Sequence, residues 1–149
     1  MSKAKSYRKK PKPAKKLSRR REVISILGLD YNEQKLNAMM CWGSRCCYCG
    51  GVLGEDTDAH HGIIPRNRGM RIDFWWNLFP THHGDCHEKG LHTRNGFELV
   101  MQKYYRVLSP ADPELGREFL VKAVAMLVES GHLKIAPVIP PVEYEGDDA

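Results

Sequence analysis

The chain has 149 residues, of which 42% are hydrophobic and 28% charged, a composition typical of one globular domain with its own core. No stretch approaches the roughly 18 apolar residues that a membrane-spanning helix needs, and no apolar run follows the N-terminal charges as in a secretory signal. We therefore expect a cytoplasmic protein with no membrane association. Five cysteines, an odd number, favour metal binding over a disulfide framework in that compartment.

The net charge of +5 is unevenly distributed along the chain. Residues 1–21 contain eleven Lys or Arg and no acidic residue, whereas the rest contains twelve basic and eighteen acidic residues. Because residues 1–21 have almost no apolar surface to bury, we expect a disordered basic arm that binds nucleic acid through its phosphates. A tail that only increases solubility is the alternative. The cations singled out for DNA binding in the arm are Lys9, Lys10, Arg19 and Arg20.

Helical signals dominate the next region, residues 22–45. A first short helix would end near Gly28. Asp30 and Glu33 then have the spacing of a capping box, which predicts a second helix over roughly 31–42.

Residues 46–94 are rich in Gly, Cys, His and Trp, a composition typical of a module stabilised by a metal ion. It contains two pairs of candidate ligands, each with two residues between its members, and four such N and S ligands complete a tetrahedral structural Zn²⁺ site. The predicted zinc ligands are Cys46, Cys49, His83 and Cys86. Cys47 and His82, which are neighbours of these ligands, are the competing candidates.

An adjacent pair, His60 and His61, lies in a stretch predicted to be extended, where successive side chains point to opposite faces. A neutral imidazole can accept a proton near pH 7 and can also bind a metal ion. One histidine can do each job if the strand is locally distorted, and Gly62 could supply that distortion as a β-bulge. Asp58 is a candidate for a further metal ligand or for a carboxylate that orients a histidine.

Three arginines, Arg66, Arg68 and Arg71, follow the histidine pair. Guanidinium groups bind phosphates through paired hydrogen bonds, so all three are candidates for DNA contacts. Trp75 and Trp76 come next, and we expect both in the core rather than stacked on nucleic-acid bases.

Two helices are predicted in residues 95–136. Phe97, Val100 and Tyr104 have helical spacing, and Asp112 followed by Pro113 is typical of the start of a second helix. Its apolar residues are expected to be buried; they are Leu115, Phe119, Leu120, Val124, Leu127 and Val128. Residues 137–149 form a tail that is rich in proline and then acidic.

Four motifs in residues 46–90 resemble those of the HNH endonucleases, members of the ββα-metal superfamily. The motifs are "CCYCG" (46–50), "HHGIIPR" (60–66), "NLFP" (77–80) and "HGDCHEKG" (83–90). The resemblance covers about 45 residues of the chain. It implies an α+β fold in which a zinc-stapled ββα-metal finger is flanked by helices. It also implies hydrolysis of DNA by a histidine general base and one divalent cation, Mg²⁺ or an ion such as Mn²⁺, leaving 3′-hydroxyl and 5′-phosphate ends.

The resemblance also assigns roles to single residues. His61 takes the position of the general base and His60 that of a metal ligand; with His60 as the base, the ligand position would fall on Ala59, which cannot bind metal. His87 corresponds to the final histidine of the family, which binds the same ion as His60. Asn77 corresponds to the central asparagine, which holds the loop that positions the base.

A further metal ligand is left open by the sequence. Some family members carry another histidine four residues after the one that corresponds to His87, but here that position is Leu91 and the next residue is His92. Either His92 or Asp58 could therefore complete the site. Arg66 is expected to hold the phosphate beside the base.

Two other functions fit parts of this sequence. A non-catalytic zinc-finger protein that binds DNA would use the arm and the zinc ligands, but not His61 or Asn77. An RNase built on the same scaffold is the other alternative. The expected substrate is double-stranded or branched DNA, which is compatible with a phage accessory nuclease that acts in the bacterial host cytoplasm with packaging or recombination proteins.

Overall fold

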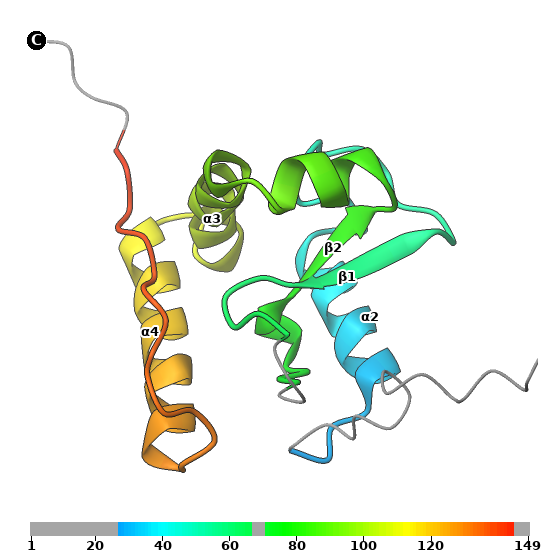
Figure 1. Ribbon diagram of the computed structural model, residues 1–149. Coiled ribbons are helices and arrows are strands. Elements are labelled where there is room, and N and C mark those ends of the chain that lie inside the picture. Colours follow the sequence, from blue (N-terminus) through cyan, green and yellow to red (C-terminus); the bar gives the residue numbers. More distant parts are fainter. Residues whose placement is uncertain (1–26, 67–70, 145–149) are drawn as a thin grey trace, which may run out of the picture.

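The computed structural model describes residues 27–66 and 71–144, which form a small α+β fold with one two-stranded sheet (Figure 1). Its elements in chain order are α2 (Tyr31–Cys41), β1 (Thr57–His61), a 3-10 helix (Trp75–Asn77), β2 (Leu78–His82), a π-helix (Cys86–Leu91), α3 (Arg94–Leu108) and α4 (Pro113–Glu129). The basic arm 1–21, most of the expected first helix and Arg68 lie outside the described residues.

The three helices predicted after Gly28 are present, and their first residues follow from side-chain caps. The Asp30 carboxylate accepts hydrogen bonds from the backbone N–H groups of Asn32 and Glu33, and α2 begins at the next residue, Tyr31. Asp112 caps α4 in the same way. Helix α3 begins before the first predicted apolar residue because the Thr93 hydroxyl accepts from the N–H of Gly96 at 3.1 Å.

Strands β1 and β2 form an antiparallel hairpin with regular pairing from Thr57 opposite His82 to His61 opposite Leu78. The N–H of Gly62 continues this pairing with a bond to the carbonyl of Asn77 at 3.0 Å. The expected β-bulge at Gly62 was therefore wrong. A glycine is needed there for another reason, because a Cβ would lie 2.5 Å from the ring of the buried Phe79.

The core joins the hairpin to the helices mainly through aromatic side chains. Tyr104 of α3 stacks on Trp42 at 5.2 Å between ring centroids and contacts Phe79 of β2 edge-on at 5.1 Å. Its buried hydroxyl donates to the carbonyl of Trp76 at 3.0 Å. Trp76 is 4% exposed, which confirms its predicted place in the core, whereas Trp75 is only half-buried.

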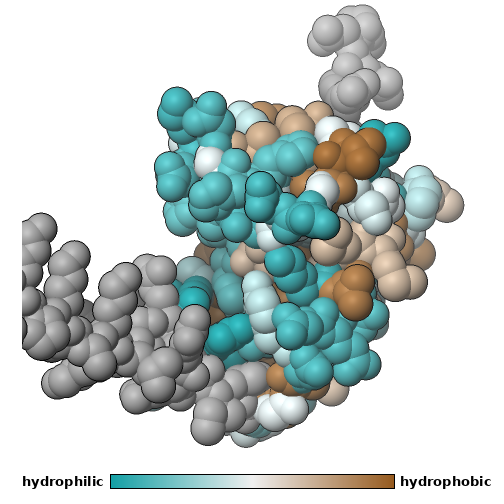
Figure 2. All heavy atoms as spheres, turned by 90° about the vertical axis from the view of Figure 1, so that its right-hand side faces the viewer, coloured by the Kyte–Doolittle hydropathy of each residue, from teal (hydrophilic) through white to brown (hydrophobic). Residues whose placement is uncertain are grey.

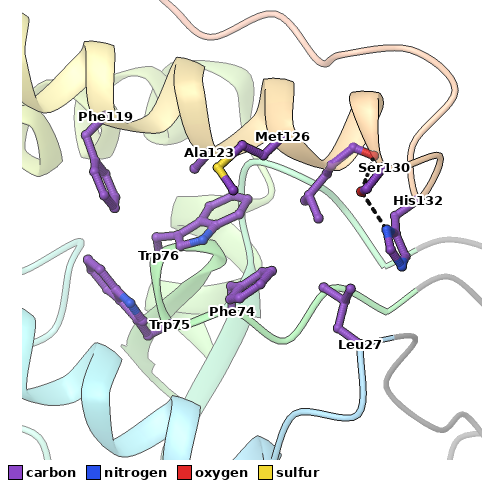
Figure 3. Close-up of a pocket in the computed structure, with 10 residues that line it drawn as sticks. Leu27, Phe74, Trp75, Trp76, Phe119, Ala123, Met126, Ser130 and His132 are labelled. Atoms are coloured by element: carbon purple, nitrogen blue, oxygen red, sulfur yellow. Dashed lines mark hydrogen bonds between the residues drawn. The ribbon is translucent and has the colours of Figure 1, made fainter.

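Helix α4 packs against α3 and buries Leu120, Val124 and Leu127, as predicted. Leu115 and Phe119 are 56% and 44% exposed, however, so their predicted burial was wrong. Phe119 instead stacks on Trp75 with 5.8 Å between ring centroids, and both line an apolar pocket of about 500 Å³ between α4 and residues 74–76 (Figure 3).

The first part of the proline-rich tail runs beside α4 and is part of the fold (Figure 1). Arg117 of α4 donates to the carbonyls of Ile139 and Pro140, and the side chains of Ile139 and Val142 are buried. The face shown in Figure 2 is mostly hydrophilic, interrupted by smaller hydrophobic areas. None of the helices within 27–66 and 71–144 combines the length and apolarity that a transmembrane span would need.

Candidate functional site

Four side chains at the base of the hairpin form a Cys₃His cluster that could hold a structural metal ion such as zinc: Cys46, Cys49, His82 and Cys86. Their ligand atoms all lie within 4.8 Å of one another. Nδ1 of His82 lies 3.3 Å from Sγ of Cys49 and 3.8 Å from Sγ of Cys86. Tetrahedral zinc, with bonds of about 2.1 Å to N and 2.3 Å to S, separates its ligands by roughly 3.5–3.8 Å. The donor atoms therefore fit zinc in both type and spacing.

The histidine of this cluster is His82, so the choice of His83 from the sequence was wrong. His82 is the last residue of β2, and its Nε2 lies 3.0 Å from the carbonyl of Val52, which leaves Nδ1 directed at the sulfurs. The His83 side chain is 74% exposed and contacts Asp58 instead. The prediction of His83 assumed two residues between the members of each ligand pair. That spacing does not apply to the second pair, because His82 is the last residue of a strand and Cys86 the first of a helix.

Residues next to the cysteine ligands, Cys47 and Gly51, help to define the Cys₃His cluster. Cys47 is 1% exposed and packs in the hydrophobic core, so its sulfur lies outside the group of four clustered ligand atoms. Gly51 allows the turn after Cys49 to lie close to His82, since a Cβ at residue 51 would lie 3.2 Å from the ring of His82 and 3.3 Å from the sulfur of Cys49.

A second cluster, of three histidines, lies beside the first and could also hold a metal ion: His60, His87 and His92. Nδ1 of His60 is 3.0 Å from Nε2 of His87. The ring centroid of His92 lies 5.0 Å from that of His60 and 4.8 Å from that of His87. Metal–nitrogen bonds of about 2.1 Å bring ligand atoms to roughly 3.0–3.4 Å, so the distance between the nitrogens of His60 and His87 is compatible with a shared ion.

The π-helix brings His92 into this cluster. In a π-helix the N–H of one residue bonds to the carbonyl five residues earlier, and His92 N bonds to His87 O at 3.3 Å. Residues five apart therefore lie on one face, where an α-helix would place residues three or four apart. This geometry favours His92 over Asp58 as the third ligand.

Asp58 and burial set the electrostatics of the three histidines. The Asp58 carboxylate lies 3.0 Å from Nδ1 of His87 and so directs Nε2 of that ring toward His60. Burial opposes ionisation of Asp58, but hydrogen bonds from His87 and His83 outweigh it and lower its pKa. Burial, together with the charges of its histidine neighbours, lowers the pKa of His60 to about 4, so this ring is neutral at pH 7, as a metal ligand must be.

His61 points to the other side of the strand from His60 and is only 9% exposed. Its Nε2 lies 2.8 Å from Oδ1 of Asp73, which is 1% exposed. Burial lowers the pKa of His61, although the bond to Asp73 opposes this shift and the charges of Arg71 and Arg66 reinforce it. The ring is therefore neutral at pH 7 and able to accept a proton.

The amide of Asn77 holds the chain beside His61. Its Oδ1 accepts from the N–H of Ile64 at 2.7 Å, and its Nδ2 donates to the carbonyls of Ile64 and Ile72, each at 3.0 Å. Asn77 is fully buried and connects both ends of the loop between β1 and the 3-10 helix. The Asn77 side chain therefore ties the backbone of Ile64 to that of Ile72.

The predicted phosphate-binding arginines have different surroundings. Arg71 is paired with Asp73 at 2.8 Å, and its guanidinium lies 4.4 Å above the ring of Tyr31, so it is a structural part of the loop. Arg66 is exposed, and its positive charge contributes to lowering the pKa of His61. Arg68 and the arm residues Lys9, Lys10, Arg19 and Arg20 lie outside the described residues.

Two functional candidates, Asp73 and Tyr31, had no signal in the sequence. Asp73 lies twelve residues after His61, across a loop whose path the sequence does not predict. Tyr31 belongs to a helix outside residues 46–94. Only the contacts of the folded chain bring them to the site. No protein-family model, curated protein or solved structure matches this chain.

Proposed function

We propose that this protein is a metal-dependent DNA endonuclease of the HNH type, with a ββα-metal finger formed by β1, β2 and the π-helix. The observation that carries the proposal is that two adjacent histidines have different environments, one suited to a metal ligand and one to a proton acceptor, although the regular strand keeps their side chains on opposite sides. His60 lies in a cluster of three imidazoles, and His61 is neutral, buried and hydrogen-bonded to a carboxylate.

In this mechanism His61 takes a proton from the water that attacks the phosphorus atom. His60, His87 and His92 would hold the divalent cation, which offsets charge on the phosphate and on the departing 3′ oxygen when bound. Arg66, whose charge already reaches His61, holds a phosphate oxygen beside it. Asn77 keeps the intervening loop in place, and the products carry 3′-hydroxyl and 5′-phosphate ends.

The donor set bears on the identity of the ion. Imidazole nitrogen suits Zn²⁺, Ni²⁺ and similar transition ions, whereas Mg²⁺ prefers oxygen ligands. The three histidines therefore favour tighter binding of a transition metal than of Mg²⁺. Hydrolysis with Mg²⁺ is still possible at concentrations high enough to fill the site.

The basic arm of residues 1–21 would hold the protein on DNA through phosphate contacts. The proposed substrate is double-stranded or branched DNA, and the proposed setting is a bacterial cytoplasm in which a phage accessory nuclease acts with packaging or recombination proteins.

The test is a plasmid-cleavage assay with EDTA, Mg²⁺, Mn²⁺ or Ni²⁺. We expect cleavage with a divalent ion and none with EDTA. His61→Ala should lower the rate by about 10²–10⁴-fold, the range for loss of a general base, and added metal should not restore it. His60→Ala should also be inactive, but with weaker binding of the second metal.

His132→Ala is the matched control, because His132 lies away from both clusters, beside Ser130 at the end of α4. Metal-independent cleavage, or an active His61→Ala variant, would contradict the proposal. An RNA substrate assayed in parallel separates DNase from RNase activity, and binding to DNA without cleavage under any metal would identify a zinc-stabilised DNA-binding protein instead.

A further inference from the structure

A chain of side-chain contacts runs from His61 to helix α2. Nε2 of His61 lies 2.8 Å from the buried Asp73 carboxylate. Nε of Arg71 lies 2.8 and 2.9 Å from the two oxygens of that carboxylate. The guanidinium carbon of Arg71 lies 4.4 Å from the ring centroid of Tyr31, the first residue of α2.

The chemistry of these groups fixes the direction of each hydrogen bond. A carboxylate only accepts, so the Nε2 of His61 must donate to Asp73. A neutral imidazole carries one proton, and with that proton on Nε2 the lone pair lies on Nδ1. The contact with Asp73 therefore selects one of the two tautomers of His61.

We propose that Tyr31, Arg71 and Asp73 are positioning residues that hold His61 with its proton on Nε2, so that Nδ1 receives the proton of the attacking water. This inference rests on the proposed nuclease function for its last step, but the selection of the tautomer does not. It makes α2, which lies outside residues 46–94, a part of the active site.

Arg71 is needed because an unpaired carboxylate would be costly to bury at 1% exposure. With its Nε between both oxygens, Arg71 also prevents rotation of the Asp73 carboxylate away from His61. Tyr31 in turn holds the guanidinium through a cation–π contact, which depends on the aromatic face and not on the hydroxyl.

The first test is Asp73→Asn in the full-length, zinc-loaded protein. Arg71 would retain the amide oxygen, so the amide NH₂ would face His61, whose Nε2 must then accept. We expect ¹⁵N NMR of the imidazole to show the proton on Nε2 in the parent protein and on Nδ1 in the variant. Cleavage should fall by about 10²–10⁴-fold, since the lone pair would point to the wrong group.

A double variant separates positioning from a merely structural role. With Arg71→Met added to Asp73→Asn, the amide can rotate and present its oxygen to His61. We expect the Nε2 proton to return, with a cleavage rate at least about tenfold above that of Asp73→Asn alone. If the two residues only stabilised the loop, the double variant would be worse than either single one.

A substitution of Tyr31, the residue of this series of contacts that lies furthest from His61, leaves the buried Asp73 carboxylate in place. Tyr31→Leu should lower cleavage by about 2- to 30-fold and give mixed His61 tautomers, because it removes the cation–π contact. Tyr31→Phe keeps the aromatic face and should keep the single Nε2 tautomer.

The two proposals fail in different ways. If the tautomer inverts in Asp73→Asn but the parent protein cuts no DNA, the positioning of His61 stands and the nuclease proposal is wrong. If the parent protein cuts DNA and Asp73→Asn keeps both the Nε2 proton and the parent rate, the positioning role is overturned.

Discussion

His87 and His92 lie five residues apart, yet their ring centroids are 4.8 Å from each other because the π-helix places both on one face. We predict that His92→Ala weakens binding of the second metal at least about tenfold, since the change removes one of three imidazole ligands. Titration of the zinc-loaded protein with Ni²⁺ in a calorimeter measures this directly. His132→Ala should bind Ni²⁺ like the parent protein, and an unchanged affinity of His92→Ala would exclude His92 as a ligand.

The adjacent residues His82 and His83 offer a matched pair for the zinc site. We predict about one tightly bound zinc per chain, lost together with the cooperative unfolding transition in His82→Ala and retained in His83→Ala. A structural zinc contributes on the order of 10 kcal/mol in small fingers, so the loss should be global. Metal analysis and thermal unfolding followed by circular dichroism are the measurements; a zinc-free His83→Ala variant would return the ligand assignment to His83.

Cleavage should depend on pH through the protonation of His61. Burial lowers the pKa of His61 from its usual 6.5, and only the neutral ring accepts a proton, so the rate should be on its plateau at pH 7 and should fall in acid with a midpoint below 6.5. Single-turnover rates at saturating metal test this. Raising the metal concentration should move to lower pH any fall in cleavage rate that is caused by protonation of the metal ligands, but not the fall caused by protonation of His61. A midpoint above pH 7 would contradict the assignment of His61 as the proton acceptor.

Deletion of residues 2–21 should weaken DNA binding and flatten its dependence on salt. The arm carries eleven cations, and each phosphate contact adds about 0.9 to the slope of log K against log salt on duplex DNA. Fluorescence anisotropy at several salt concentrations measures the slope. Zinc content and thermal stability are the controls and should not change, and an unchanged slope would mean that the arm does not contact DNA.

The sequence predicted the parts of this structure that depend on local rules. Asp30 and Asp112 predicted two helix starts because a cap needs only the next few N–H groups. The extended histidine pair was placed correctly on opposite faces because alternation is a property of any strand. The α+β class, which the resemblance to HNH endonucleases implies, is confirmed.

The remaining parts of the site depend on long-range contacts or on uncommon helix geometry. His92 was left open because its spacing fits a π-helix and not an α-helix. Spacing favours His83 over the competing His82, because the sequence does not show which way the end of a strand turns. Asp73 could not be predicted, since its contact with His61 spans a loop of irregular structure.

The two metal clusters meet at a single peptide bond, because Cys86 belongs to one and His87 to the other. Any shift of the helix backbone that accompanies binding of an ion at one cluster therefore changes the positions of the ligands in the other cluster. If both clusters bind an ion, linkage requires that the factor by which zinc tightens binding of the second metal equals the factor by which that metal tightens binding of zinc. With the proposed nuclease function, a weakened cysteine site is expected to appear first as a higher metal requirement for cleavage.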